Sequence, residues 1–374
     1  MNGSHLSART ARGAALAASL GLFTVLAAAA AGDRPFIPNL DISSTIPANG
    51  DINPYGIAFV PAGFPAGGRI AAGDVLVANF NNSSNLQGTG TTIIQFTPSD
   101  KVAPSGSART FFQGNLPGLT TALGVLKGGF VVVGNLPAKY NPDGSVASIG
   151  QGSLEFLDRQ GNVVSILSDP VFFDGPWDLT IADNGDRAQL FVSNVLNGTV
   201  SRVDLAVEPG AITVQRVTLV ATGYLTRTDP AALVVGPTGL AFDEKNDTLY
   251  VAATGDNAIF AVAHAGRAMA PAGTGRRVFS DPHLRGPLAL ALAPNGHLLT
   301  ANGDAVNPDP THPSEIIEFT RQGEFVREFS LDPGQGAAFG IATNLEKNAP
   351  FNLALVNDVT NAVVVYGLAT KGED

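Results

Sequence analysis

Short apolar segments alternate with polar turns along most of the 374-residue chain. The stretch 236–262 is the clearest example: an apolar segment after a Gly-Pro pair leads into a polar turn at 243–247, and two further apolar segments follow at 249–253 and 257–262. Short segments rich in β-branched and aromatic residues, bounded by Gly, Pro, Asn and Asp, are typical of β-strands joined by tight turns. The pattern predicts an all-β fold.

This plan recurs five more times, so the chain contains six similar units. Their first strands are expected at 53–59, 122–126, 175–181, 236–242, 286–291 and 338–342. The first five units have room for four strands each, whereas the last unit ends after three.

Repeated four-stranded units predict the blades of a β-propeller, because each sheet needs neighbours to bury both of its faces. We therefore predict a six-bladed β-propeller with four-stranded blades. The segment 36–43 is expected to pair with the last blade as its fourth strand, which closes the ring and removes an open sheet edge. A pair of β-sandwiches is the alternative, and it is disfavoured because sandwiches do not repeat one strand and turn pattern at fixed offsets.

The first 31 residues differ from the repeats. Arg9 and Arg12 precede a run of apolar and small residues at 13–31 that ends in alanines, which is typical of a cleaved secretory signal peptide. A membrane anchor is the alternative, and the run is barely long enough to span a bilayer. We expect residues 1–31 to be a signal peptide and residues 32–374 to be a single exported propeller domain.

The composition limits the cellular compartments and the classes of partner that fit this chain. The chain has no cysteine, which excludes disulfides, thiolate nucleophiles and zinc-thiolate sites and fits secretion or a bacterial periplasm. Its net charge of −10 disfavours nucleic acid, and no basic cluster predicts attachment to a membrane after signal cleavage. We expect a monomer whose partner is a small molecule, a glycan or a protein.

Several short motifs recur at equivalent places in the units. The first strands carry P-x-G-[IL]-A, N-G or D-x-N turns follow, and the next strands read [LF]-[YF]-V-[AS]-[NT] and N-x-[TAV]-[VI]. In these motifs the chain resembles NHL-repeat and SMP-30/gluconolactonase-like six-bladed propellers over nearly all of its mature length. The resemblance implies the architecture more specifically than the activity, because such propellers include lactonases, lyases and binding scaffolds. Asp178 and Ala289 depart from the motif, since each replaces its glycine.

The resemblance also implies a place for a metal. In the lactonases of this group, Glu, Asn and Asp at several of the x positions of P-x-G bind a divalent cation at the mouth of the axial channel. We assign these positions here to Tyr55, Leu123, Trp177, Thr238, Leu288 and Phe339. Apolar side chains cannot form that site, and Asp178 is the nearest carboxylate. We therefore expect no lactonase-type metal centre and no cofactor.

Two sets of residues are candidates for ligand binding at the channel mouth. The aromatic residues Tyr55, Trp177 and Phe339 are expected to form either an apolar plug or an aromatic pocket, with Asp178 and Thr238 beside them. The second strands end in a polar residue, and these residues are Asn79, Asn135, Asn194, Thr254, Asn302 and Asn357. They either face a polar ligand or bind the local backbone as turn caps, and both roles are compatible.

The loop from Asn302 to His312 contains several Asn and Asp side chains and one histidine. It is the best local candidate for Ca²⁺, although its spacing matches no EF-hand and proline-interrupted Asn/Asp loops are usually turns. The other histidines are scattered, and no G-x-S-x-G motif is present.

Two functions remain open at the level of the sequence. The first is an exported, non-catalytic propeller that binds a ligand or partner at the mouth of its axial channel. The alternative is a hydrolase or lyase of the SMP-30/lactonase-like kind whose active site has moved, with Asp178, Asn194 or Asn302 and a divalent cation as candidate components.

Overall fold

The computed structural model describes residues 38–98, 103–303, 306, 309–346 and 349–367. The expected signal peptide lies outside these residues. The described residues form β-strands and contain no helix long and apolar enough to cross a membrane.

The strands form six four-stranded antiparallel sheets that follow one another along the chain. Blade one contains β2 (Ile52–Phe59), β3 (Val75–Asn81), β4 (Thr92–Phe96) and β5 (Arg109–Gln113). Blade two contains β6 (Leu119–Leu126), β7 (Phe130–Asn135), β10 (Ser153–Asp158) and β11 (Val163–Leu167). Blade three contains β12 (Pro176–Asp183), β13 (Arg187–Asn194), β14 (Thr199–Glu208) and β15 (Ala211–Thr222).

The remaining blades follow the same order from inside to outside. Blade four contains β18 (Pro237–Asp243), β19 (Thr248–Ala253), β20 (Ala258–Ala263) and β21 (Arg276–Phe279). Blade five contains β22 (Pro287–Leu292), β23 (Leu298–Asn302), β24 (Glu315–Phe319) and β25 (Phe325–Ser330). Blade six contains β26 (Ala338–Thr343), β27 (Leu353–Asn357), β28 (Ala362–Gly367) and, as its outer strand, β1 (Asn39–Ser44).

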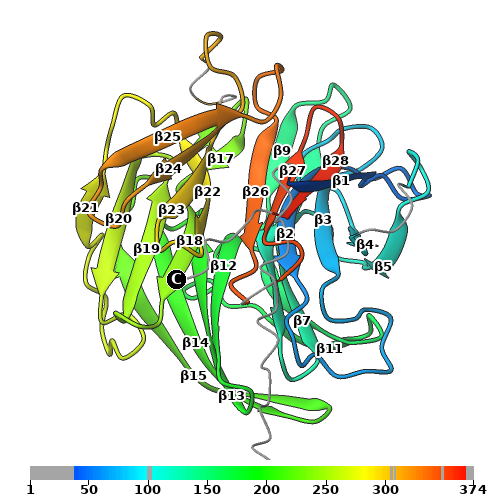
Figure 1. Cartoon of the computed structure of the whole chain (residues 1–374), viewed down its shortest axis with the longest axis horizontal. Helices are drawn as coiled ribbons and strands as arrows, with labels where there is room; N and C mark the ends of the chain where they lie inside the picture. The colour runs from blue at the N-terminus through cyan, green and yellow to red at the C-terminus, as the bar shows by residue number, and fades with distance from the viewer. Residues whose placement is uncertain (1–37, 99–102, 304–305, 307–308, 347–348, 368–374) are drawn as a thin grey trace, which may run out of the picture. The chain divides into compact units, whose positions relative to one another are not determined.

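The six inner strands surround a central axis (Figure 1). Each inner strand contacts the inner strand of the next blade, and β26 contacts β2, so the sheets form a closed ring. Strand β1 pairs antiparallel with β28 from Asn39 opposite Gly367 to Ser44 opposite Ala362. The predicted six-bladed propeller and its closure by the N-terminal strand are both confirmed.

The glycines of the P-x-G motif mark the places where neighbouring inner strands come closest. A Cβ atom at Gly239 would lie 2.4 Å from the backbone of Ala289 and Leu290 on β22, and one at Gly340 would lie 2.1 Å from the carbonyl oxygen of Tyr55 on β2. Only glycine fits there without moving the next blade. Each inner strand also has an irregular register at this motif, for example between Pro237 and Leu240.

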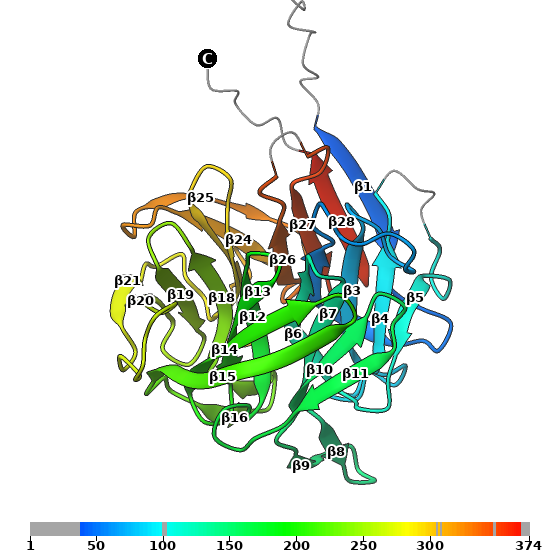
Figure 2. The ribbon, with the colours of Figure 1, turned by 90° about the horizontal axis from the view of Figure 1, so that it is seen from below.

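Two small hairpins interrupt the repeat. The first hairpin, within residues 137–152, contains β8 (Ala138–Tyr140) and β9 (Val146–Ile149). The second contains β16 (Arg227–Asp229) and β17 (Leu233–Val235), and the sequence did not predict it. Figure 2 shows β8, β9 and β16 at the same edge of the molecule. Both hairpins belong to connections at the end of the ring where the inner strands begin.

Candidate functional site

Four aromatic rings fill the end of the axial channel where the inner strands begin. Tyr55 stacks on Phe339 at 4.3 Å between ring centroids, and Trp177 meets the rings of Tyr55 and Phe80 edge-on at 5.8 and 5.5 Å. Only 2% of Trp177 is exposed, and the other three rings are buried as well. Phe80, on the second strand of blade one, was missed by sequence reasoning because it lies outside the repeat motif. We call these four residues the aromatic cluster.

The aromatic cluster is covered by the two hairpins and by the loop 82–91. Ala138 from β8 and Leu233 and Val234 from β17 belong to the same buried core as the four rings. Gln87 in the loop joins the two hairpins, because its carbonyl oxygen accepts a hydrogen bond from Tyr140 Oη at 2.8 Å. Its Nε2 donates to the carbonyl oxygen of Ala231 at 3.0 Å. The mouth is therefore filled with side chains, and hydrogen bonds join the loop 82–91 to both hairpins above it.

The structure corrects the assignment of Leu123 to an x position. Leu123 pairs with Val133, just as Ile57 pairs with Val77, so Leu123 is equivalent to Ile57 rather than to Tyr55. Blade two has one extra residue before this point, and Thr121 takes the place beside Trp177, whose carbonyl oxygen accepts a hydrogen bond from Thr121 Oγ1. The extra residue was hidden because blade two has neither the Pro nor the Gly of the motif, whereas each of the other blades keeps at least one of them.

Below the aromatic cluster, one aliphatic residue from each blade faces the axis. These six equivalent residues are Ile57, Leu123, Leu179, Leu240, Leu290 and Ile341. They surround a cavity of about 50 Å³, which Thr121 and Asp178 also line. A space of this size holds one or two water molecules, because a water molecule occupies about 30 Å³ in the liquid.

Asp178 is the carboxylate of this cavity. It takes the place of the motif glycine, and its two oxygens accept hydrogen bonds from the backbone N–H of Leu179 and of Leu240 on the next blade, both at 2.9 Å. Burial raises the pKa of Asp178 to about 8, although these two hydrogen bonds act in the opposite direction. Asp178 thus ties blade three to blade four at the axis.

The residues of the channel do not fit the metal centre of a lactonase. Both oxygens of Asp178 are used by backbone donors, and the x positions present Tyr55, Thr121, Trp177, Thr238, Leu288 and Phe339. Thr238 Oγ1 donates to the carbonyl oxygen of Pro287 on the next blade at 3.0 Å. Burial, with a smaller contribution from Asp358, raises the pKa of Tyr55, so its phenol is neutral at physiological pH.

The asparagines at the ends of the second strands are buried and bind mainly within their own blades. Asn79, Asn135 and Asn302 donate from Nδ2 to the carbonyl oxygens of Thr45, Pro117 and His283, at 3.0, 3.2 and 2.8 Å. Asn357 donates to Asp332 Oδ2 at 2.9 Å. These four partners all lie in the connection that leads into the inner strand of the same blade.

The other two members of this set differ. Asn194 donates to Thr199 and Ser201 on the neighbouring strand at 3.0 and 3.2 Å. Thr254 donates to the carbonyl oxygen of Pro287 at 2.6 Å, and thereby joins blades four and five. Ligand binding by this set stays a prediction, and the observed contacts are those of residues that hold connections in place.

Some buried polar atoms near the mouth have no hydrogen-bond partner among the described residues. They include Trp177 Nε1, Asn79 Oδ1 and Asn194 Oδ1. An unpaired buried donor or acceptor is costly, and such atoms commonly meet ordered water or a ligand. Trp177 Nε1 is such a donor, and it lies buried within the aromatic cluster.

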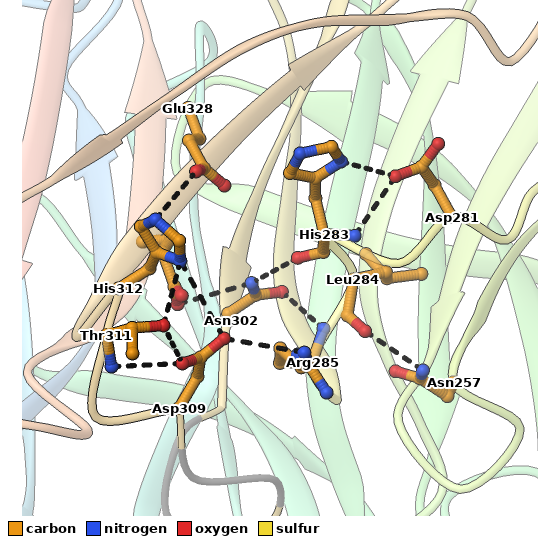
Figure 3. Close-up of polar contacts among 11 residues, drawn as sticks. Asn257, Asp281, His283, Leu284, Arg285, Asn302, Asp309, Thr311, His312 and Glu328 are labelled. Atoms are coloured by element: carbon orange, nitrogen blue, oxygen red, sulfur yellow. Dashed lines mark hydrogen bonds and ion pairs between the residues drawn. The ribbon is translucent and has the colours of Figure 1, made fainter.

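A second group of chemically capable side chains lies on blade five, and Figure 3 shows the polar contacts among them and their neighbours. Asp309, His312 and Glu315 place one potential ligand atom each within 4.8 Å of one another. We call these three residues the metal-ligand cluster. It overlaps the loop from Asn302 to His312 that the sequence singled out, of which residues 304–305 and 307–308 lie outside the described residues. Glu315, the first residue of β24, was missed because it lies beyond that loop.

Other charged and polar groups surround the metal-ligand cluster. Arg285 Nη2 lies 3.4 Å from Asp309 Oδ2, and His312 Nε2 lies 3.9 Å from Glu328 Oε1 on β25. Asn302 Nδ2 donates to Glu315 Oε2 at 3.3 Å. Figure 3 shows Arg285 beside Asp309, and Glu328 beside His312.

Comparison with known proteins supports the fold. No family model and no curated protein matches the chain. Among solved structures, a luciferin-regenerating enzyme is 12% identical, with 90% of this chain and 98% of that chain covered and a TM-score of 0.53. A proposed gluconolactonase is 14% identical, with 91% and 95% covered and a TM-score of 0.53. A proposed oxidoreductase (glucose dehydrogenase) from Thermus thermophilus is 13% identical, with 88% and 100% covered and a TM-score of 0.50.

At these identities the likeness concerns the fold alone. The propeller architecture is shared with SMP-30/gluconolactonase-like structures, as the motifs predicted. The more specific NHL-repeat assignment stays a prediction.

Proposed function

We propose that the chain is an exported binding propeller, which holds a small molecule, a glycan or a protein at the end of the ring where the inner strands begin. The observation that carries this proposal is the packed mouth of the channel. The places where lactonases bind their metal are occupied by buried aromatic, aliphatic and threonine side chains. The cavity surrounded by the aliphatic ring below has a volume of about 50 Å³, enough for one or two water molecules.

The covering segments favour binding at this end of the ring. The loop 82–91 and the hairpins β8–β9 and β16–β17 are additions to the basic four-stranded blade and are tied together through Gln87. Loops carried on a rigid scaffold are the usual place for recognition. A ligand on their outer surface leaves the aromatic cluster buried, whereas one that enters the channel must displace them.

A second candidate function is a hydrolase or lyase with an active site outside the channel. The solved structures that share the fold include a luciferin-regenerating enzyme and a proposed gluconolactonase. The metal-ligand cluster favours this candidate, because one imidazole and two carboxylates on blade five supply the ligand types of a hydrolytic metal site.

A ligand screen separates these functions. Sugars, lactones and peptides are added to the purified protein while its melting temperature and the fluorescence of Trp177, its single tryptophan, are recorded. A ligand of the native state raises the melting temperature by mass action. We expect such a ligand without lactone consumption and with unchanged Trp177 emission, because the indole is buried beneath the cover.

Two results contradict the binding proposal. Steady hydrolysis of a lactone that is lost in Asp178→Asn would place catalysis in the channel. Hydrolysis that is lost in His312→Gln but kept in Asp178→Asn would favour the second candidate.

A further inference from the structure

We propose that Asp309, His312 and Glu315 bind one divalent transition-metal ion, with Zn²⁺ preferred over Ca²⁺. This site goes beyond the binding function proposed above and is independent of the ligand at the channel mouth. It lies on blade five, between the loop that precedes β24 and the outer strand β25.

The three side chains already stand close to a coordination geometry. Their candidate ligand atoms all lie within 4.8 Å of one another. An ion placed between three atoms at that separation lies roughly 2.8 Å or less from each, so side-chain shifts of less than about 1 Å reach the 2.0–2.2 Å of zinc bonds to nitrogen and oxygen. The positions of Asp309 and His312 in one turn, with Glu315 at the start of a strand, allow such shifts without moving the blade.

Each of the three ligands has an outer partner that orients it. Thr311 donates to Asp309 Oδ1 from its backbone N at 3.0 Å and from Oγ1 at 2.6 Å, which leaves Oδ2 directed towards His312 Nδ1 at 3.9 Å. Asn302 donates to Glu315. His312 Nδ1 lies 3.2 Å from Thr311 Oγ1 and 3.9 Å from Asp309 Oδ2, so an ion must displace the contact with Thr311, while Nε2 lies 3.9 Å from Glu328 Oε1.

This last arrangement points to a metal rather than to a simple ion-pair network. A metal-bound histidine usually donates its second ring N–H to a carboxylate, which fixes the tautomer and the ring orientation. Glu328 Oε1, at 3.9 Å from Nε2, is beyond hydrogen-bond distance and comes within it through a side-chain shift of roughly 1 Å when Nδ1 binds the ion. Glu315 is only 2% exposed, so a carboxylate is buried beside the imidazole, where an added cation offsets the cost of its charge.

The ligand types select the metal. Ca²⁺ prefers six to eight oxygen ligands, whereas one imidazole with two carboxylates is a set that suits Zn²⁺ with a water molecule in the fourth position. His312 is 59% exposed at its side chain, so solvent can supply that water. The sequence named this loop only as the best local candidate for Ca²⁺, and our proposal assigns a softer ion to it.

Arg285 competes with the ion for Asp309. Its guanidinium lies 3.4 Å from Asp309 Oδ2, the oxygen that faces the cluster, and its side chain is 45% exposed. An exposed arginine can turn into solvent when a divalent ion takes its place. Removing its charge is therefore expected to strengthen metal binding, which no purely structural role of the three ligands would predict.

Isothermal titration of the full mature chain, without a polyhistidine tag, tests the site with Zn²⁺ and Ca²⁺ as probes. We expect one Zn²⁺ per chain, a weakening of at least about 10-fold in His312→Gln and in Asp309→Asn, and tighter binding in Arg285→Gln. His283→Gln is the matched control. His283 Nδ1 lies 2.5 Å from Asp281 Oδ1, and His283 is not a member of the metal-ligand cluster. The control is expected to bind Zn²⁺ as the unaltered chain does.

Three outcomes overturn the proposal: the absence of Zn²⁺ binding, tighter binding of Ca²⁺ than of Zn²⁺, or full affinity in His312→Gln. Melting curves of each variant establish that it is folded, and the exposed position of His312 makes its substitution the least disruptive of the three. Failure of this titration leaves the ligand screen at the channel mouth unaffected, so the two proposals are tested separately.

Discussion

Asp178 adds hydrogen bonds between two neighbouring inner strands at the centre of the ring. Blades one, four and six have a glycine at this place, and a Cβ atom at Gly239 or Gly340 would collide with the next inner strand. In blade three an aspartate fits, and its carboxylate bridges Leu179 and Leu240. The sequence identified Asp178 as the channel carboxylate, but the contact with Leu240, 62 residues away, required the structure.

The raised pKa of Asp178 predicts a pH dependence of stability. Burial raises its pKa to about 8 in the folded chain, above its unfolded value of about 3.9. The stabilisation by the protonated group is therefore complete below about pH 4 and is lost as the pH rises towards and through about 8. Asp178→Asn does not titrate, so the free energy of unfolding of the unaltered chain should fall relative to that of the variant over this range and level off above it.

Urea unfolding between pH 5 and pH 9 measures this difference. Burial also raises the pKa of Glu155 and of Asp358, each to about 7, but both residues are present in both proteins and cancel in the comparison. Parallel stability curves for the two proteins would show that Asp178 does not titrate in this range.

At the scale of elements, the repeat pattern predicted the strands of the blades, but not the register of blade two or the additional hairpin between blades three and four. Strand positions follow from apolar segments and turn residues, and the ring closure follows from the missing fourth strand of the last unit. The register of blade two does not follow, because its extra residue before Leu123 has no Pro or Gly to mark it. The hairpin β16–β17 consists of two three-residue strands, too short to produce a periodic pattern.

The strand-end asparagines join strands of a blade to the connections between blades. Asn135 accepts hydrogen bonds from Ser153 N at 2.7 Å and from Ser153 Oγ at 2.9 Å, and donates to Pro117, so it joins β10 to the connection before β6. The sequence predicted the places of these asparagines and the possibility of capping. Their partners come from elsewhere in each blade, which the local sequence does not specify.

Substitution of Asn135 tests this role. Asn135→Ala leaves buried partners without hydrogen bonds and is expected to lower the free energy of unfolding by about 1–3 kcal/mol. Asn246→Ala is the control, because Asn246 is exposed and its Nδ2 bonds Asp243 within one turn. Chemical denaturation measures both variants, and equal losses would contradict a connecting role for Asn135.

At the scale of the whole molecule, the closed ring and its filled centre form one unit. Strand β1 joins the first described residues to the last blade, and the aliphatic ring contributes one side chain from every blade. Closure leaves no inner strand without a neighbour on either side. Stability is therefore expected to depend on both ends of the chain together.

Truncation tests the closure. A chain that starts at residue 45 lacks β1 and exposes the edge of β28, so its melting temperature should fall well below that of a chain that starts at residue 32. The longer chain is the control for removal of the expected signal peptide. Equal melting temperatures would mean that pairing of β1 with β28 adds nothing to the ring.

The central claim is that the mouth of the channel is packed with the aromatic cluster and that ion binding belongs to blade five. Zinc titration of Asp178→Asn and of His312→Gln tests it most directly. The first substitution removes the carboxyl group of the channel cavity, and the second removes the imidazole of the metal-ligand cluster. We predict that Asp178→Asn binds Zn²⁺ as the unaltered chain does and that His312→Gln loses most of the affinity. Loss of binding in Asp178→Asn with full binding in His312→Gln would place the ion in the channel and contradict the account.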